Sequence, residues 1–181
     1  MDLDEAIKGR RSIRVFKSDD IPVEHIESVL EAATFAPSAK NGQQWRFTIL
    51  RDEAKDKFTD WFMDHLLSMR KKHGDTFMGS AIPSCEIMNE APVSIIVWNT
   101  NEFGWLTEHQ SVAAAIQNML LKAYSLGIGS LWIGDIFYAE RRIPGYFNKS
   151  WALAAAVVLG WPAENPGPRP RLSVDEVAEF L

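Results

Sequence analysis

The sequence predicts a single domain of the α+β class. Segments with a helical spacing of apolar residues are mixed irregularly with short apolar runs typical of strands, so the strict strand–helix alternation of a doubly wound sheet is missing. At 181 residues the chain is long enough for about one domain, and no linker or repeat divides residues 1–181. Hydrophobic residues make up 46% and charged residues 24% of the chain, a composition typical of globular proteins.

Two helices are expected in the N-terminal part of the chain. A short one is expected around residues 4–8, and a second one begins with Pro22 as its first residue and Asp20 just upstream as a candidate cap. This second helix should end near Phe35, because Pro37 disfavours helical backbone at the residue before it. Four apolar residues at helical spacing mark its buried face: Ile26, Val29, Leu30 and Ala33.

The middle of the chain is expected to hold two strands and one helix. Turn-forming residues over 37–42 precede a strand over 45–50, and a continuous β-branched run over 93–98 indicates a central strand. An amphipathic helix between them is marked by Phe58, Trp61, Phe62, His65, Leu66 and Met69. Residues 71–90 show no clear periodicity.

The C-terminal half is expected to contain a long helix, two strands and a last short helix. The long helix should end at Gly127, which suits a left-handed cap, and the strands cover 128–133 and 151–159. Ser173 followed by Glu176 forms a capping box that opens the last helix. The buried stripe of the long helix is marked by Val112, Ala115, Ile116, Met119, Leu120 and Ala123.

Charge and hydropathy argue against nucleic acid and membrane partners. The formal net charge is −5, which disfavours binding to nucleic acid through bulk charge. The N-terminal residues are acidic and lack the apolar core of a secretory signal. The longest uncharged stretch, residues 150–163, is shorter than the roughly 18 apolar residues that a membrane span needs. We therefore expect a cytoplasmic protein.

Cysteine and histidine usage excludes several kinds of chemistry. Cys85 is the only cysteine, so the chain has neither an internal disulfide nor the thiolates for an iron–sulfur cluster. The four histidines show no metal-ligand spacing, and no serine lies in a nucleophile-elbow motif, so we expect no metal site and no hydrolase triad. Any redox chemistry must therefore use an organic cofactor.

Two arginine-rich segments stand far apart in the sequence. The second segment, Arg169 and Arg171 around Pro170, follows a proline-rich path that favours a stiff extended backbone. The first segment consists of Arg10, Arg11, Ser12 and Arg14. Guanidinium groups stay charged and offer a planar fork of donors, which suits a phosphate or an anionic ring edge. The alternative interpretation is that both segments are solvated surface features.

Four blocks of sequence, in order, resemble those of the nitroreductase family of FMN-dependent oxidoreductases. They are residues 10–16 (RRSIRVF), 36–45 (APSAKNGQQW), 115–121 (AIQNMLL) continuing to Gly134, and 159–171 (LGWPAENPGPRPR). The likeness covers nearly the whole chain. Gln44 stands where the family usually has proline, and residues 61–90 do not align with the segment in which family members build the substrate pocket.

The resemblance implies a central, mainly antiparallel sheet flanked by helices, in an intertwined homodimer that shares two FMN sites. It implies that Arg10, Ser12, Arg169 and Arg171 hold the FMN phosphate and that Arg14 lies near the N1–O2 edge of the ring. Arg11 is expected to belong to the cofactor site as well. It further implies that Pro37, Ser38, Asn41 and Gln43 reach the flavin from the partner subunit. Ile133 and Gly134 then line the N5 side, where glycine lets a flat ring approach the backbone.

The same resemblance implies transfer of a hydride from NADH or NADPH, through flavin N5, to an electron-poor small molecule such as a nitroaromatic or a quinone. Two alternatives stay open at this point. One is other FMN chemistry on the same fold, such as enoate reduction, dehalogenation or flavin destruction. The other is a flavin-binding protein without turnover. The preferred nicotinamide, the physiological acceptor, the role of Cys85 and the pocket residues within 61–90 stay open as well.

Overall fold

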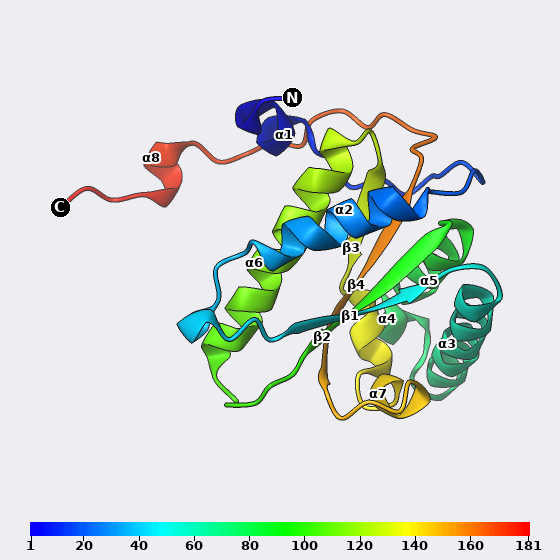
Figure 1. Ribbon diagram of the computed structural model, residues 1–181. Coiled ribbons are helices and arrows are strands. Elements are labelled where there is room, and N and C mark those ends of the chain that lie inside the picture. Colours follow the sequence, from blue (N-terminus) through cyan, green and yellow to red (C-terminus); the bar gives the residue numbers. More distant parts are fainter.

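A four-stranded antiparallel sheet forms the centre of the computed structural model, which describes residues 1–181 apart from the side chain of Phe77. The strand order is β1 (Trp45–Leu50), β2 (Val93–Asn99), β4 (Ala152–Gly160) and β3 (Gly129–Ile133), and every neighbouring pair is antiparallel. The expected α+β class and antiparallel sheet are thus confirmed (Figure 1).

Helices cover both faces of the sheet, as Figure 1 shows. On one face, α2 (Val23–Thr34) and α6 (Leu106–Ser125) bury their apolar residues against alternate side chains of β2 and β4. On the other face, α3 (Asp52–His73) and α5 (Ala81–Glu90) enclose a second apolar cluster. All seven residues of β2 are buried, because this strand lies inside the sheet with both faces covered.

The long helix α6 follows the expected pattern. Its apolar stripe is buried, and the backbone leaves the helix at Gly127, whose φ of +75° lies in the left-handed region that glycine adopts without a steric penalty. The capping box also forms: Ser173 and Glu176 exchange hydrogen bonds at the start of α8 (Val174–Val177). Other short elements are α1 (Leu3–Gly9), η1 (Ala39–Asn41), α4 (Asp75–Met78), η2 (Asp135–Ala139) and α7 (Ile143–Tyr146).

The expected start of α2 was wrong in detail. The helix begins at Val23 with Pro22 in the N-cap position, and no side chain caps it. The Asp20 carboxylate lies 4.0 Å from the Arg51 guanidinium instead, and the Asp20 carbonyl accepts a hydrogen bond from the Trp161 indole. A proline at N-cap already sets the backbone angle that leads into the helix, so a side-chain cap is not required there.

Residues 71–90, which lacked periodicity in the sequence, are largely helical. They contain the end of α3, the single turn of α4 and the whole of α5. Gly74 and Gly79 have positive φ angles and separate these helices, so no segment is long enough to show a stripe. Pro83 lies in the first turn of α5, where its missing N–H removes no helical hydrogen bond.

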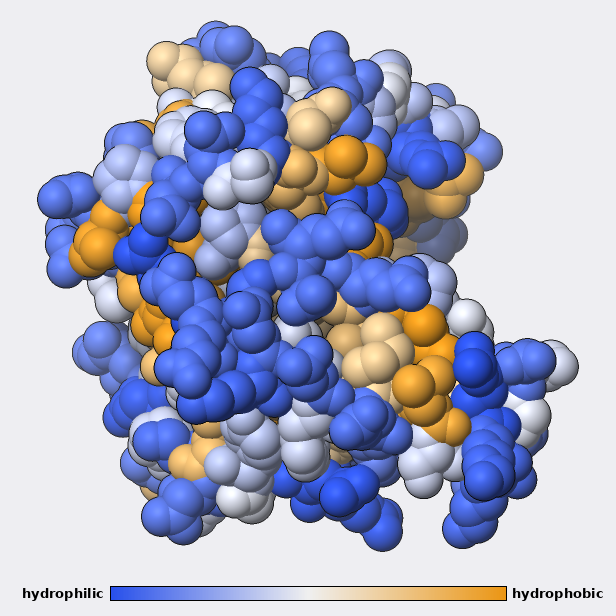
Figure 2. Space-filling view, turned by 90° about the vertical axis from the view of Figure 1, so that its right-hand side faces the viewer, coloured by the Kyte–Doolittle hydropathy of each residue, from blue (hydrophilic) through white to orange (hydrophobic). Residues whose placement is uncertain are grey.

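The surface is mostly hydrophilic on the side that carries α3, with apolar atoms in separate patches (Figure 2). No helix among the described residues has the length and apolarity needed to cross a membrane.

Candidate functional site

The two arginine-rich segments meet in the folded chain. The stretch after α1 runs beside the sheet: the Ile13 amide donates to the Ser130 carbonyl at 3.0 Å, and the Ala163 amide donates to the Val15 carbonyl at 2.9 Å. The chain that leaves β4 is thereby held next to the N-terminal segment. Together they enclose a cavity of about 310 Å³, here called the arginine cavity, lined by Arg10, Arg11, Ser12, Arg14, Pro166, Gly167, Arg169 and Arg171.

The arginine cavity is strongly positive. Burial lowers the pKa of Arg10, and the nearby charges of Arg171 and Arg11 lower that pKa further. Among the described residues, none of the arginines lining the cavity forms an ion pair with a carboxylate. Like charges that face one another without a counter-ion are stabilised by a bound anion. A phosphate group therefore fits the residues present.

The arginines of the cavity differ in what their guanidinium groups already bind. Arg11 donates to the carbonyls of Lys8, Gly9 and Arg10 at 2.7–3.1 Å, so it caps the end of α1. The backbone amides of Arg14 and Val15 both donate to the Glu164 carboxylate. Glu164 thus positions the Arg14 backbone, a role that sequence reasoning missed because its backbone partners lie near the other end of the sequence.

Pro37, Ser38, Asn41 and Gln43 lie elsewhere in the same chain. Pro37 and Ser38 line another cavity, of about 290 Å³, against the start of α6. The Gln43 amide donates to Ser38 Oγ at 3.1 Å, which closes this loop on itself. Lys40, Asn41 and Gln43 have φ angles of +49° to +53°. The fold does not bring this loop into the arginine cavity of its own chain.

Ile133 and Gly134 end β3. Ile133 is buried, whereas Gly134 is exposed. Apart from its two chain neighbours, no described residue lies within 4 Å of the position that a Cβ would occupy at Gly134. Open space over a glycine backbone allows a planar ring to approach closely. The next residue, Asp135, accepts hydrogen bonds from Ser80 Oγ at 2.7 Å and from Ser84 Oγ at 2.5 Å, so it ties the start of η2 to α5.

Gln44 is the residue that departs from the family pattern. Its side chain is 1% exposed, and neither the amide oxygen nor the amide nitrogen has a hydrogen-bond partner among the described residues. The Gln44 carbonyl accepts from the Thr100 amide at 2.9 Å, so the backbone at this point is paired.

Cys85 is a core residue. Its side chain is buried, and Sγ donates to the Thr59 carbonyl at 3.4 Å. Burial raises the pKa of Cys85 to about 12, and the nearby carboxylates of Glu86 and Asp60 contribute in the same direction. A thiol with so high a pKa is neutral near pH 7 and is a poor nucleophile.

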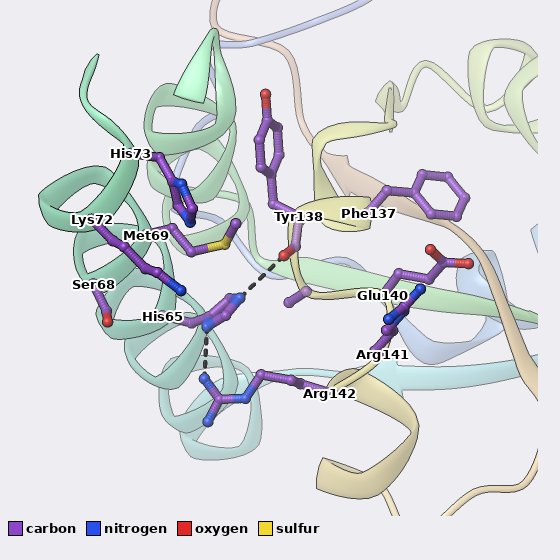
Figure 3. A pocket seen from close by; sticks show the side chains of 11 residues that line it. His65, Ser68, Met69, Lys72, His73, Phe137, Tyr138, Glu140, Arg141 and Arg142 are labelled. Atoms are coloured by element: carbon purple, nitrogen blue, oxygen red, sulfur yellow. Dashed lines mark hydrogen bonds between the residues drawn. The ribbon is translucent and has the colours of Figure 1, made fainter. Parts of the chain in front are cut away.

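A further cavity, of about 500 Å³, opens between α3 and the segment 137–142 (Figure 3). It is here called the α3–η2 cavity. Five of its lining residues come from the part of the chain that did not align with the family: His65, Ser68, Met69, Lys72 and His73. The His65 ring is held by two hydrogen bonds, at 3.1 Å to the Tyr138 carbonyl and at 2.6 Å to Arg142 Nη1.

Comparisons with known proteins place the sequence in a family. The sequence profile described as the nitroreductase family matches residues 7–161. A protein of Thermus thermophilus named NADH dehydrogenase is 44% identical and covers 98% of this chain and 95% of the relative. A 5,6-dimethylbenzimidazole synthase of Rhodospirillum rubrum is 29% identical over 90% of this chain and 82% of its own.

The fold is also similar to solved structures. A Desulfovibrio desulfuricans protein assigned as a nitroreductase, solved in complex with FMN, superimposes with a TM-score of 0.77 and is 28% identical. The match covers 98% of this chain and 95% of that one.

Proposed function

The chain belongs to the nitroreductase family, and we infer that it is an NAD(P)H-dependent flavin oxidoreductase with FMN as its cofactor. The main structural support for this proposal is the arginine cavity. It brings Arg10, Arg169 and Arg171 together from the two ends of the chain, without carboxylate partners among the described residues. Such a cluster supports binding of the dianionic phosphate of FMN.

We assign the remaining contacts as follows. Ser12 adds a hydroxyl donor to the phosphate site, and Arg11 adds charge to it while it remains bound to the end of α1. Arg14, whose backbone is held by Glu164, places a cation near the N1–O2 edge of the ring. A fixed positive charge there favours the negative charge that gathers on this edge during reduction. The backbone of Ile133 and Gly134 faces the N5 side.

Bound FMN would supply the hydride acceptor and donor. The chain's own residues hold and orient the ring, and no side-chain nucleophile or general base is required. The rate of such a reaction depends strongly on positioning, since donor and acceptor atoms must come within roughly 3–3.5 Å. We propose NADH or NADPH as the electron donor and a nitroaromatic, quinone or similar electron-poor small molecule as the acceptor. A cytoplasmic location also stays a prediction.

The complete site requires a homodimer with two shared FMN molecules in this proposal. Pro37, Ser38, Asn41 and Gln43 do not line the arginine cavity of their own chain, so they are free to complete a partner's site. The C-terminal arm supports the same conclusion. This arm, residues 172–181, carries α8 away from the body of the molecule (Figure 1), and it exposes five apolar side chains: Leu172, Val174, Val177, Phe180 and Leu181.

A second candidate function is chemistry in which the flavin itself is consumed. The similarity to a 5,6-dimethylbenzimidazole synthase supports it, because that product contains a dimethylated benzene ring like the one in FMN. Reduced FMN whose visible absorbance does not return on exposure to air, with release of the benzimidazole, would favour this alternative. A flavin that is reduced slowly by both nicotinamides would indicate a binding protein without turnover.

Substitution of the cavity arginines tests the FMN assignment. We expect Arg171→Ala and Arg10→Ala each to weaken FMN binding by about tenfold or more, because each removes a charge-assisted contact worth roughly 1.5–3 kcal/mol. The measurement is quenching of FMN fluorescence in a titration. Arg70→Ala is the matched control, because Arg70 lies on α3, outside the arginine cavity, and forms a surface ion pair with Asp75. Wild-type affinity in either cavity variant would contradict the role assigned to that residue.

A further inference from the structure

The α3–η2 cavity carries cations that the proposed FMN site does not use. Lys72, Arg141 and Arg142 line it, whereas Glu140 is the single carboxylate among its lining residues. None of these four side chains forms an ion pair among the described residues. The excess positive charge stands out in a chain whose formal net charge is −5.

Arg142 is held in place by neutral groups. Its Nη1 lies 2.6 Å from His65 Nδ1, and its guanidinium lies 5.5 Å from the centroid of the Trp61 ring. Because a guanidinium can only donate, His65 Nδ1 is the acceptor, and His65 Nε2 then carries the proton that binds the Tyr138 carbonyl. His65 is therefore neutral, and it orients Arg142 without cancelling the arginine's charge.

The charges do not serve only to stabilise a helix end. Lys72 lies in the last turn of α3, where a cation interacts favourably with the helix dipole. Arg141 and Arg142, however, belong to the segment after η2, on the opposite wall of the cavity. Figure 3 shows Lys72 and Arg142 approaching His65 from these two walls. Convergence of cations from separate elements on one hollow is the arrangement that binds a multivalent anion.

We propose that the α3–η2 cavity is a second anion site, which binds a phosphate group of a small molecule and is separate from the arginine cavity. Its volume of about 500 Å³ exceeds that of the arginine cavity, so it has room for more than an inorganic ion. One source of the phosphate is the 2′-phosphate of NADPH. The segment η2, which forms one wall of the cavity, begins directly after Gly134, and Gly134 is assigned to the N5 side of the flavin, where the nicotinamide would react. That source rests on the proposed function. The other source is free phosphate or a phosphomonoester.

Calorimetric titration of the FMN-loaded protein tests the proposal, since bound FMN blocks the arginine cavity. The probes are inorganic phosphate, NAD+ and NADP+, because the oxidised nucleotides carry the same phosphates as NADH and NADPH but cannot reduce the bound FMN. We expect Lys72→Gln and Arg142→Gln to weaken binding of a phosphate-bearing probe by about tenfold or more. Lys71→Gln is the matched control, because Lys71 is in the same helical turn but does not line the cavity. Arg142→Lys, which keeps the charge, should lose less affinity than Arg142→Gln.

The outcomes separate the two sources. Weaker binding of NADP+ with unchanged NAD+ identifies the 2′-phosphate, whereas weaker binding of inorganic phosphate with both nucleotides unchanged identifies a separate phosphate ligand. The proposal is overturned if all three probes bind Lys72→Gln as tightly as Lys71→Gln, or if wild-type protein binds neither phosphate nor NADP+. A protein that retains no FMN contradicts the proposed function instead. Without FMN, inorganic phosphate could also enter the arginine cavity. Phosphate is therefore titrated into the double variant Arg10→Ala, Arg171→Ala, in which the arginine cavity has lost two charges and the α3–η2 cavity is unchanged.

Discussion

At the residue scale, neighbouring arginines differ in the partners that their guanidinium groups already have. Arg11 is bound by three backbone carbonyls at the end of α1, whereas Arg10 is partly buried beside Arg171 and has no carboxylate partner among the described residues. Arg142 resembles Arg10 in having no carboxylate partner among the described residues, and its guanidinium is held by the neutral His65. Partly buried arginines without a carboxylate partner are the ones we expect to bind phosphate.

Cys85 allows a prediction at the same scale. Because burial raises its pKa to about 12, alkylation by iodoacetamide at about pH 8 should be at least 100-fold slower in the native than in the unfolded protein. Mass spectrometry of the single-cysteine chain measures both rates. The raised pKa also means that this residue's contribution to stability is complete below pH 9.0 and is lost as pH rises toward about 12. Rapid labelling of native protein would contradict the buried, neutral thiol.

At the element scale, the strands and the long helices were predictable from the sequence, and the short helices were not. The strand over 93–98 and the helix that ends at Gly127 carry continuous patterns that burial explains directly. The region of α4 and α5 could not be interpreted, because Gly74 and Gly79 divide it into pieces too short to show a period. The two walls of the α3–η2 cavity are likewise separated in sequence, and only the fold brings them together.

The same limit applies to the site. The arginine clusters and the loop around Ser38 were found through motifs, and the structure shows that the two arginine clusters meet. Glu164 and Asp135 were missed because each is a single carboxylate whose partners are backbone amides or distant serines. Such contacts depend on tertiary structure alone.

Asp135 provides a test of how α5 is tied to the end of β3. Asp135→Ala removes the acceptor of two serine hydroxyls, so we expect the free energy of unfolding to fall by about 1–2 kcal/mol. Denaturant unfolding measures this change. Asp64→Ala is the control, since Asp64 is an exposed residue of α3 with no hydrogen bond or ion pair among the described residues. Equal stability of both variants would show that the two serine contacts contribute nothing.

At the scale of the whole molecule, the C-terminal arm links the fold of one chain to the proposed dimer. Its apolar side chains are 64–111% exposed, and each could contribute roughly 1.5–3 kcal/mol if fully buried against a partner. Deletion of residues 173–181 leaves Arg169 and Arg171 in place. We expect this deletion to raise the dimer dissociation constant at least tenfold, as measured by analytical ultracentrifugation. A wild-type chain that is monomeric with FMN tightly bound would contradict a cofactor shared between subunits.

The central claim is that this chain holds a flavin that a nicotinamide nucleotide reduces. The visible absorption spectrum of the purified protein, recorded before and after anaerobic addition of NADH and then NADPH, tests it most directly. We predict the spectrum of bound oxidised FMN and its bleaching within seconds by at least one of the two nucleotides. A colourless protein that also fails to bind added FMN would contradict the claim.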